Sequence, residues 1–570
     1  MERRVILAVL LMLIVAVLPS ILFPPKKPDR RAGARPDSTT TPAAAAAESA
    51  TAPVRPSASP TVRPSASAPA ETVWVTSPLY RLGFTTRGGA LVRAELLGYR
   101  SFAKADSGRP VQLVREGVPL LIYRRTGGGG GGGAGGGAGG GGDTTRVSDW
   151  SLTPSATQVQ VGSEGATLTF TGARDGARLA LEYRFFPAEY RFAVRGRMEG
   201  FGPAGATLLL GLGDGLRSVE ADSMDDFRHY AVVTKATKTQ RTDFGSLKPA
   251  ERKILDGPFE WAGVKSKYFF IAALVVEDNQ PRFGAALVEG GPRTVSTSSL
   301  FGRSTVATRA AVAVTLPVPP AGGFDYQLYV GPLEFRRLSQ LGHDLDDANP
   351  YGGFLQPIIQ PVSVLVVNIL IWMHDRLTLA YGWVLIIFGI LVRLLLWPLN
   401  QRAMESSIRM QAVAPLLKQI QDRYKNEPER LQREMMKLYK EHNVNPFGGC
   451  LPMLLPMPVL FALFFVFANT IEFRGVPFLW LPDLSRADPY YIIPIVMGLS
   501  MFVLSKVGQI GMPPNPQTKM MLYFMPAFLT LLFLNFASGL NLYYAVSNIF
   551  SIPQQYLIAQ RRLREQGKRT

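Results

Sequence analysis

Long apolar runs gather at the start of the 570-residue chain and in its last two hundred residues. Each run is close to the ~20 residues that a helix needs to cross about 30 Å of hydrocarbon. They predict six membrane-spanning helices, in the segments Val5–Phe23, Tyr381–Leu399, Leu451–Thr470, Tyr490–Val507, Met520–Phe536 and Leu540–Ile558. We therefore expect an integral membrane protein.

From Thr72 to about residue 335 the pattern changes to short runs in which every second residue is apolar, as in Thr167–Thr171 and Tyr190–Arg195. This period is typical of half-buried β-strands, and turns with Gly and Pro separate the runs. The region is predicted to be a large antiparallel β-sandwich. Fourteen glycines and two alanines at 127–142 predict a flexible surface loop within it.

Two further segments lie outside this pattern. Residues 24–71 are rich in Pro, Ala, Ser and Thr, a composition that cannot bury a core and predicts a disordered linker. The run from Phe354 to about Leu377 is apolar but contains prolines and polar residues. We expect it to form an amphipathic helix in the outer membrane interface, because a seventh crossing would invert the charge pattern.

A helical hairpin is predicted between the second and third spans. Apolar stripes mark its two helices, with Leu416, Ile420 and Tyr424 on the first and Leu431, Met435 and Leu438 on the second. Asn426 and Pro428 indicate the turn between them. The stripes are expected to face each other or the membrane, in an antiparallel pair that projects into the cytoplasm.

The net charge of +18 is unevenly placed. Nine Lys and Arg residues lie in the segment from Arg402 to Lys440. Arg3 and Arg4 lie near the start of the chain, and five more lie in its last ten residues. With six spans these regions share one side of the membrane, as the positive-inside rule requires of the cytoplasm. Both termini are thus expected inside and residues 24–350 outside. The charge favours contact with anionic membrane lipids rather than with a specific nucleic acid.

The first span follows Met-Glu-Arg-Arg, as in a signal peptide, but no small-residue cleavage site closes it. An uncleaved anchor is expected. Cys450 is the only cysteine, so the exported domain carries no disulfide.

These patterns divide the chain into eight parts. They are an anchor at 1–23, a linker at 24–71, the sandwich at 72–335, a connecting and interfacial helix at 336–378, the second span at 379–400, the cytoplasmic hairpin at 401–447, four further spans at 448–560 and a basic cytoplasmic tail at 561–570.

Residues suited to catalysis are scarce. The four histidines show no metal-ligand spacing, and no nucleotide-binding motif or nucleophile elbow is present. Asp and Glu are absent from the interiors of the predicted spans, which argues against a proton-coupled pump. We expect no enzyme activity, no metal and no cofactor.

Arg393 is a charged residue inside the second predicted span. An arginine at the centre of a spanning helix costs ~2.5–3.5 kcal/mol on insertion scales. Its side chain therefore either faces a hydrated cavity or an anion, or extends to the cytoplasmic rim, because Trp397 and Pro398 follow closely.

Polar residues recur along the last predicted span at three- and four-residue steps and form one face, made of Tyr544, Asn548, Ser551 and Gln555. Paired with Arg393 across a bundle, this face would make a hydrophilic groove. Alternatively, it supplies hydrogen bonds between helices.

Three segments resemble a known family. They are Asn-Pro-Phe-Gly-Gly-Cys-Leu-Pro-Met-Leu-Leu-Pro-Met-Pro at 445–458, Ser-Gly-Leu-Asn-Leu-Tyr-Tyr at 538–544 with Ser547-Asn548 and Gln554-Gln555 beyond it, and Leu391-Val-Arg393 followed by Trp397-Pro398-Leu399. They are similar to the third span, the last span and the arginine-bearing span of the YidC membrane-protein insertases. The resemblance is strong over 354–560 and thinner at 261–269 and 329–332. Pro456, Ala537 and Pro553 depart from the family pattern.

The resemblance implies a bacterial inner-membrane insertase with a five-helix core, whose groove opens to cytoplasm and lipid but is closed on the outer side. It implies that Arg393 draws a hydrophilic, often acidic, substrate segment into a groove. The expected groove residues are Arg393, Tyr543, Tyr544, Asn548, Ser551 and Gln555.

The expected partners are nascent membrane-protein substrates and the Sec translocon. The tail after Gln560 has only ten residues, so ribosome contact is expected to be weak. The exported sandwich is expected to resemble sugar-mutarotase folds.

Two other functions fit parts of the sequence. A secondary transporter would explain an intramembrane charge and interrupted helices but would predict internal repeats, and the six spans show none. A membrane-anchored carbohydrate-binding module would need carboxylates and histidines that converge on one site, whereas His229 is the only histidine of the sandwich.

Overall fold

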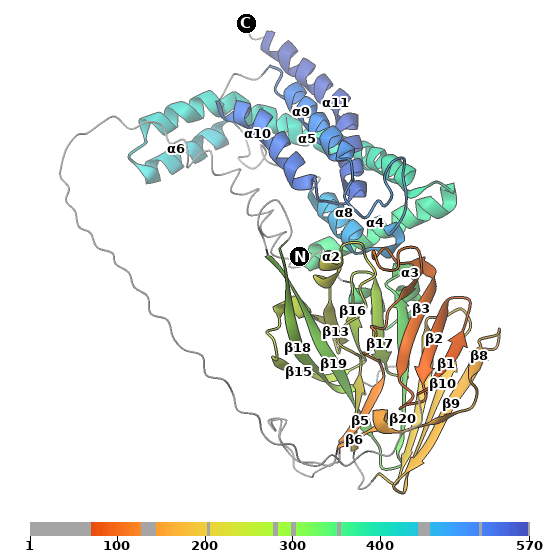
Figure 1. Cartoon of the computed structure of the whole chain (residues 1–570). Helices are drawn as coiled ribbons and strands as arrows, with labels where there is room; N and C mark the ends of the chain where they lie inside the picture. Colours follow the sequence, from red (N-terminus) through yellow and green to blue (C-terminus); the bar gives the residue numbers. More distant parts are fainter. Residues whose placement is uncertain are drawn as a thin grey trace, which may run out of the picture. The chain divides into compact units, whose positions relative to one another are not determined.

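The computed structural model describes residues 70–126, 144–201, 206–276, 283–297, 304–349, 351, 355–442, 457–511 and 516–567. Strands occupy the first part of this range and helices the second (Figure 1). The arrangement confirms a β-rich domain followed by helices. The predicted anchor, nearly all of the linker and the glycine-rich run at 127–142 lie outside the described residues.

The described strands of the β domain form three sheets. The first contains, in spatial order, β4 (Pro110–Gln112), β3 (Leu91–Arg100), β2 (Tyr80–Thr85), β1 (Thr72–Thr76) and β8 (Gln158–Gln160). The second contains β14 (Thr239–Asp243), β13 (Ala231–Lys235), β16 (Trp261–Lys265), β17 (Phe269–Leu274), β20 (Gly323–Pro332), β11 (Arg191–Glu199), β10 (Ala177–Phe185), β9 (Ala166–Arg174) and β7 (Thr153–Pro154). The third contains β15 (Arg252–Phe259), β18 (Phe283–Thr297), β19 (Ser304–Val318), β12 (Ala206–Gly211), β5 (Ile122–Thr126) and β6 (Thr144–Arg146).

The alternation in the sequence sets which side chains enter the core. In β10 the side chains of Leu179, Leu181, Tyr183 and Phe185 are buried, while Arg184 between the last two is exposed. Strands β16 and β17 are instead buried along their whole length, as in a sheet covered on both faces. Neighbouring strands are antiparallel apart from β1 and β8, which pair in parallel.

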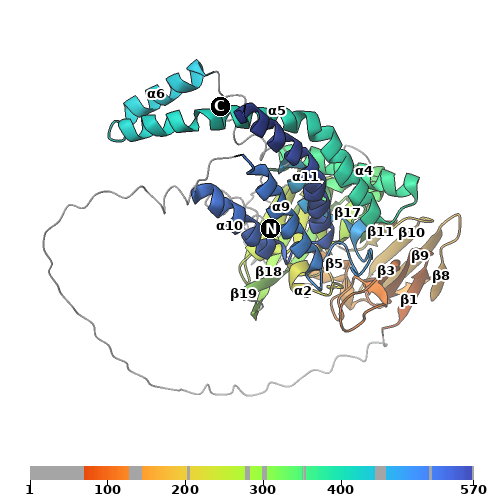
Figure 2. The same cartoon turned by 90° about the horizontal axis from the view of Figure 1, so that it is seen from above.

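Helices follow the last strand. They are α3 (Phe335–Leu341), α4 (Gln356–Leu377), α5 (Tyr381–Arg423), α6 (Pro428–Glu441), α8 (Met457–Asn469), α9 (Ile492–Gly508), α10 (Pro516–Phe533) and α11 (Ser538–Gly567), while the short α2 (Ser223–Phe227) belongs to the β domain. Helix α11 packs against α5 and α9, and the three lie side by side in both views (Figures 1 and 2).

Within the described residues, two stretches of helix are long and apolar enough to cross a membrane, Gln356–Leu377 and Tyr381–Gln401. Shorter apolar helices occupy Met457–Asn469, Ile492–Gly508 and Leu522–Phe533. The six spans thus stay a prediction. So does the interfacial position of α4, because its length and composition would also allow a crossing.

The second predicted span and the first arm of the hairpin form one helix of 43 residues, α5, with no loop between them. The predicted turn is confirmed, since α6 begins at Pro428. Val413 and Leu438 are buried together, and Ile420 packs against them. The two stripes therefore face each other in part, whereas Leu416 is exposed.

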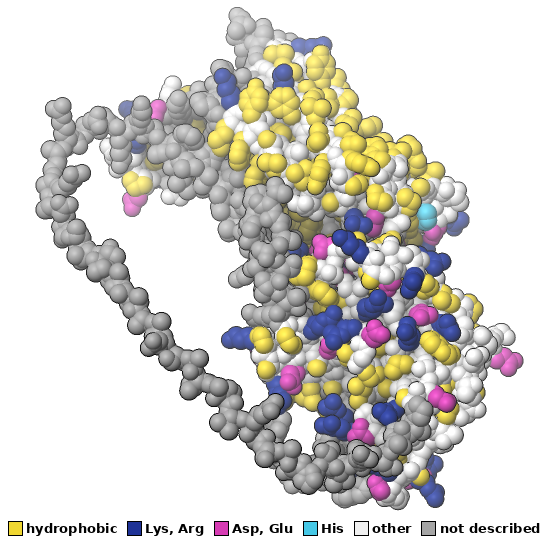
Figure 3. Space-filling view, in the orientation of Figure 1, with side chains coloured by type: hydrophobic (Ala, Val, Ile, Leu, Met, Phe, Trp, Pro, Cys, Tyr) yellow, Lys and Arg dark blue, Asp and Glu magenta, His cyan; other side chains and the backbone are white. Residues whose placement is uncertain are grey.

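Hydrophobic side chains predominate on the visible surface of the helices other than α6, while Lys, Arg, Asp and Glu are scattered over that of the strands (Figure 3). Leu395 of α5 is 78% exposed and Leu531 of α10 is 67% exposed. Exposed apolar surface of this kind is typical of contact with lipid.

Candidate functional site

The predicted site lies where α5 and α11 approach each other. Gly389 of α5 faces Tyr543, and a Cβ atom at position 389 would lie 3.4 Å from the tyrosine ring. The rings of Phe388 and Tyr543 pack with their centroids 6.1 Å apart. The absence of a side chain at Gly389 thus allows the close helix contact that brings Arg393, one turn later, beside α11.

Arg393 is half-buried at this contact. Its Nε donates a hydrogen bond of 2.9 Å to the hydroxyl of Ser547 and a longer one, 3.3 Å, to the Ser547 carbonyl oxygen. Both partners are uncharged. The guanidinium is therefore attached to α11 without loss of its charge.

A second polar contact joins the same two helices further along. The side chain of Gln554 donates to the Trp397 carbonyl oxygen at 3.3 Å and accepts a bond from Asn400 at 3.2 Å. Gln554 is buried, so these bonds also satisfy an amide that would otherwise be costly to remove from water. Together with Ser547 it fixes the register between α5 and α11.

The residues of the predicted stripe lie on a neighbouring face of α11. The Tyr544 ring packs against Phe533 of α10 with centroids 5.6 Å apart, and Asn548 donates to the Ser500 hydroxyl of α9 at 3.3 Å. A Cβ atom at Gly508, the last residue of α9, would lie 2.8 Å from the Gln555 amide nitrogen. These three side chains are directed toward α9 and α10.

The two remaining predicted residues lie nearer to Arg393. Tyr543 packs against α5, as described above, and the Ser551 hydroxyl donates to the Ser547 carbonyl oxygen of its own helix at 2.6 Å. The structure therefore joins Arg393 to Ser547, which the predicted site did not include. The signal was present in the sequence, because positions 543, 547 and 554 also recur at helical spacing.

The N-terminal end of α11 is hydrogen-bonded to the loop between α8 and α9. The backbone N–H groups of Ser538 and Gly539 donate to the carbonyl oxygens of Arg486 and Leu484, at 2.6 and 2.9 Å. Asp488 in turn accepts bonds from the N–H groups of Tyr490 and Ile493. The loop thereby satisfies amide groups that a helix N-terminus leaves without partners.

The same loop contacts the β domain through a buried ion pair. Nε of Arg474 lies 2.7 Å from a carboxylate oxygen of Glu220, and these side chains are 2% and 11% exposed. The guanidinium also lies over the Phe102 ring, 4.3 Å from its centroid. Nearby, Glu472 accepts a bond from the Phe335 N–H, and burial raises the pKa of Glu472 to about 7.

Titratable residues also meet inside the β domain, close to α2. Lys267 pairs with Asp225 at 2.9 Å, burial raises the pKa of Asp226 to about 7, and burial lowers the pKa of His229 to about 3. Across the described residues, no group of three or more His, Cys, Asp and Glu side chains could hold a metal ion.

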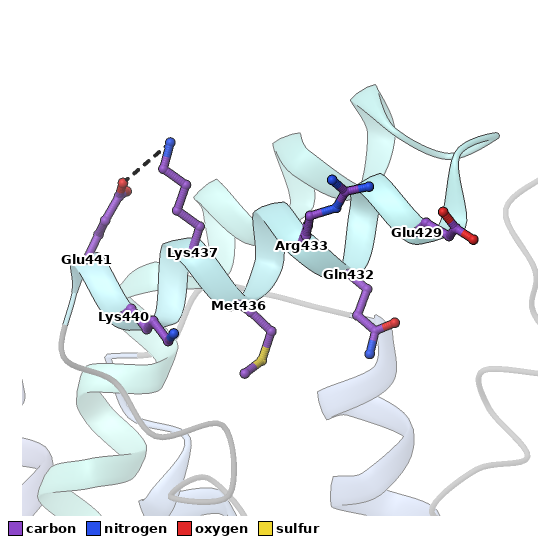
Figure 4. A pocket seen from close by; sticks show the side chains of 7 residues that line it. All are labelled: Glu429, Gln432, Arg433, Met436, Lys437, Lys440 and Glu441. Atoms are coloured by element: carbon purple, nitrogen blue, oxygen red, sulfur yellow. Dashed lines mark ion pairs between the residues drawn. The ribbon is translucent and has the colours of Figure 1, made fainter.

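An open depression lies along α6 (Figure 4). It is lined by Glu429, Gln432, Arg433, Met436, Lys437, Lys440 and Glu441. All of these side chains come from one helix, and Lys437 and Glu441 form an exposed ion pair. Residues on a single exposed helix face do not enclose a small molecule, so we do not assign the depression as a ligand site.

Two family models match the chain. The model of the YidC periplasmic domain matches residues 72–365, and that of the 60Kd inner membrane protein matches residues 372–566.

Individual relatives match over most of their length. The chain is 32% identical to the membrane protein insertase YidC of Syntrophus aciditrophicus, over 86% of this chain and 85% of that protein. It is 29% identical to the membrane protein insertase YidC of Oleidesulfovibrio alaskensis, over 90% of each. A crystal structure of an active YidC insertase with the first transmembrane domain resolved aligns with 98% of this chain and 99% of its own, at 16% identity and a TM-score of 0.33.

Proposed function

The chain belongs to the YidC family of membrane protein insertases, and on this premise we propose that its substrates enter a hydrophilic groove beside Arg393. As a family member it is an inner-membrane insertase with a periplasmic domain. The observation that supports the groove is the state of Arg393. Within the described part of the chain its hydrogen bonds go to Ser547 alone, which carries no charge.

A guanidinium without an acidic partner attracts an anionic group of a substrate, because charge-assisted bonds between arginine and carboxylate are roughly twice as strong as neutral ones. A hydrophilic substrate segment with acidic residues would enter the groove from the cytoplasm. The apolar helix that follows would then slide into lipid.

The membrane potential favours this direction of transfer. Each acidic charge carried outward across an inside-negative membrane gains about 2.3 kcal/mol per 100 mV. A hydrated groove also shortens the hydrocarbon path that the polar segment must cross. The process requires no covalent step, so the protein is not an enzyme in the ordinary sense.

The proposal includes the arrangement expected from the sequence. Six spans, five of them forming the core, place both termini in the cytoplasm and residues 24–350 in the periplasm. Nascent membrane proteins are the substrates, and the Sec translocon and anionic lipids are further partners. Tyr543, Tyr544, Asn548, Ser551 and Gln555 complete the proposed groove.

Complementation tests the function directly. The gene is expressed in cells depleted of their own insertase, and insertion of a small two-span protein with an acidic exported tail is followed by protease protection of that tail. We expect wild-type protein to restore insertion and the Arg393→Ala variant, at equal abundance, to restore much less. Equal rescue by both would refute a role for the arginine, and failure of both would refute autonomous insertion.

A further inference from the structure

We infer that Ser547 is a positioning residue for Arg393, holding one edge of the guanidinium so that its outer edge is presented to an acidic substrate group. The inference rests on the proposed function of Arg393 but concerns a different residue. The bonds that Arg393 makes to described residues both use Nε, and both end on Ser547. The terminal nitrogens Nη1 and Nη2 make no hydrogen bond within the described residues.

The geometry of the guanidinium explains why it matters that Nε is bonded to described residues and the two Nη nitrogens are not. The guanidinium is planar, and a carboxylate is bound best when two parallel N–H groups point at its two oxygens. A bond at Nε fixes the plane of the group and restricts rotation of the long side chain. The two Nη nitrogens then stay in one orientation. A substrate carboxylate therefore meets N–H groups that already point toward it, instead of a side chain that must first be ordered.

Ser547 is itself held in place by its surroundings. Its carbonyl oxygen accepts a bond from the Ser551 hydroxyl at 2.6 Å, and the residue is buried. Gly389 permits the close approach of α5 on one side of this point, and Gln554 bridges to Trp397 on the other. The hydroxyl therefore stands opposite Nε because the register of two helices puts it there.

The chemistry of a hydroxyl suits this role. Aspartate or glutamate at position 547 would hold the guanidinium more strongly but would neutralise its charge and compete with the substrate. Alanine would leave Nε with only the longer bond to the backbone carbonyl oxygen, so the side chain would be held less firmly. Serine holds the arginine and leaves its charge available.

The test compares two substrates that differ only in the exported tail, one acidic and one neutral, in cells depleted of their own insertase. The variants are Ser547→Ala, Ser547→Thr, Ser547→Asp and Arg393→Ala, with protein abundance measured for each. The matched control is Ser363→Ala, because Ser363 is a fully buried serine of α4 whose hydroxyl has no hydrogen-bond partner among the described residues.

We expect Ser547→Ala to slow insertion of the acidic-tailed substrate roughly tenfold, the lower end of the effect of losing one hydrogen bond to a charged group. Ser547→Thr should restore the rate, because it keeps the hydroxyl. Ser547→Asp should resemble Arg393→Ala. Insertion of the neutral-tailed substrate, and all rates of Ser363→Ala, should stay at the wild-type level.

Two results would overturn the inference. Wild-type rates for Ser547→Ala with the acidic tail would show that the bond does not matter. Equal slowing of both substrates, without rescue by threonine, would show a structural role in helix packing. These outcomes are separate from the test of the proposed role of Arg393, which fails if Arg393→Ala itself inserts the acidic-tailed substrate normally.

Discussion

At the scale of single residues, Arg393 combines two properties that rarely coexist in a membrane helix. It is half-buried, and the partner that holds it is neutral. A paired arginine would have its charge cancelled, and an arginine at the rim would extend into the headgroups. We propose that a charge held by a serine is instead available to a visiting anion.

Substitutions of Arg393 separate three roles. If it acts as a charge in a hydrated groove, Arg393→Lys should insert substrates with acidic exported tails at about the rate of Ser547→Ala, because it keeps the charge without the oriented guanidinium, while Arg393→Ala impairs them further. A purely anchoring arginine would make alanine nearly silent. A buried structural pair would lower the abundance of both variants, because lysine cannot reproduce the bidentate geometry. Insertion assays with an immunoblot for abundance distinguish these cases, and we expect the first.

His229 gives the β domain a predictable response to acid. Its pKa is lowered by burial to about 3, from an unfolded value near 6.5, so the unfolded chain binds more protons between these values. The stability that His229 contributes is therefore present above pH 6.5 and is lost as the pH falls toward 3. The free energy of unfolding, measured by denaturant titration, should decrease less between pH 6.5 and 4 in His229→Gln than in the wild type. An unchanged slope would contradict the prediction.

The sequence could place Arg393 in a span but could not name its partner. The periodicity of the last span selects two adjacent faces equally well, one through Tyr544 and Asn548 and one through Tyr543 and Ser547. Which face meets α5 depends on the rotation of α11, and that rotation is set by packing at Gly389 and by the Gln554 bridge. These are contacts between distant parts of the chain, which a local pattern does not contain.

At the scale of elements, the contact between α5 and α11 depends on a small residue at position 389. A Cβ atom there meets Tyr543 at 3.4 Å, an ordinary contact, so Gly389→Ala should be tolerated. Gly389→Leu should force the helices apart, cost about 1–3 kcal/mol of stability and slow insertion of acidic and neutral substrates alike. Thermal unfolding in detergent and the two-substrate assay measure these effects. A stable, active leucine variant would show that the helices do not need to approach closely.

Helix lengths were harder to anticipate than helix positions. The helix that contains the predicted span Tyr381–Leu399 does not end with it, because α5 continues without a break to Arg423. Helix α11 likewise continues through Pro553, whose side chain is exposed. Proline is tolerated in membrane helices where neighbouring groups and small local adjustments satisfy the backbone that it frees.

At the scale of the whole molecule, orientation can be tested with single cysteines. Both Ser163 in the β domain and Gln421 near the end of α5 are exposed, so accessibility to a thiol reagent depends on the side of the membrane. With Cys450 replaced, a membrane-impermeant reagent added to intact cells should label Ser163→Cys and not Gln421→Cys. After the cells are opened, both should react. Labelling of position 421 in intact cells would contradict the proposed topology.

The β domain should be largely dispensable for insertion, because Arg393, Ser547 and the hairpin all follow residue 354. Removal of residues 80–325, with the anchor kept, deletes Glu220 but also opens Arg474 to water, where its charge is solvated. Glu220→Ala leaves Arg474 buried without a partner, a change that costs about 3–5 kcal/mol.

We therefore expect the deletion variant to retain most insertion activity and the point variant to be less thermally stable than the wild type. Glu199→Ala is the matched control, because the Arg197–Glu199 pair is exposed and worth at most about 1 kcal/mol. Complete loss of insertion by the deletion variant at normal abundance would mean that the β domain takes part in the mechanism. In that case the buried Arg474–Glu220 contact, which joins it to the loop that holds the start of α11, is the physical connection through which it would act.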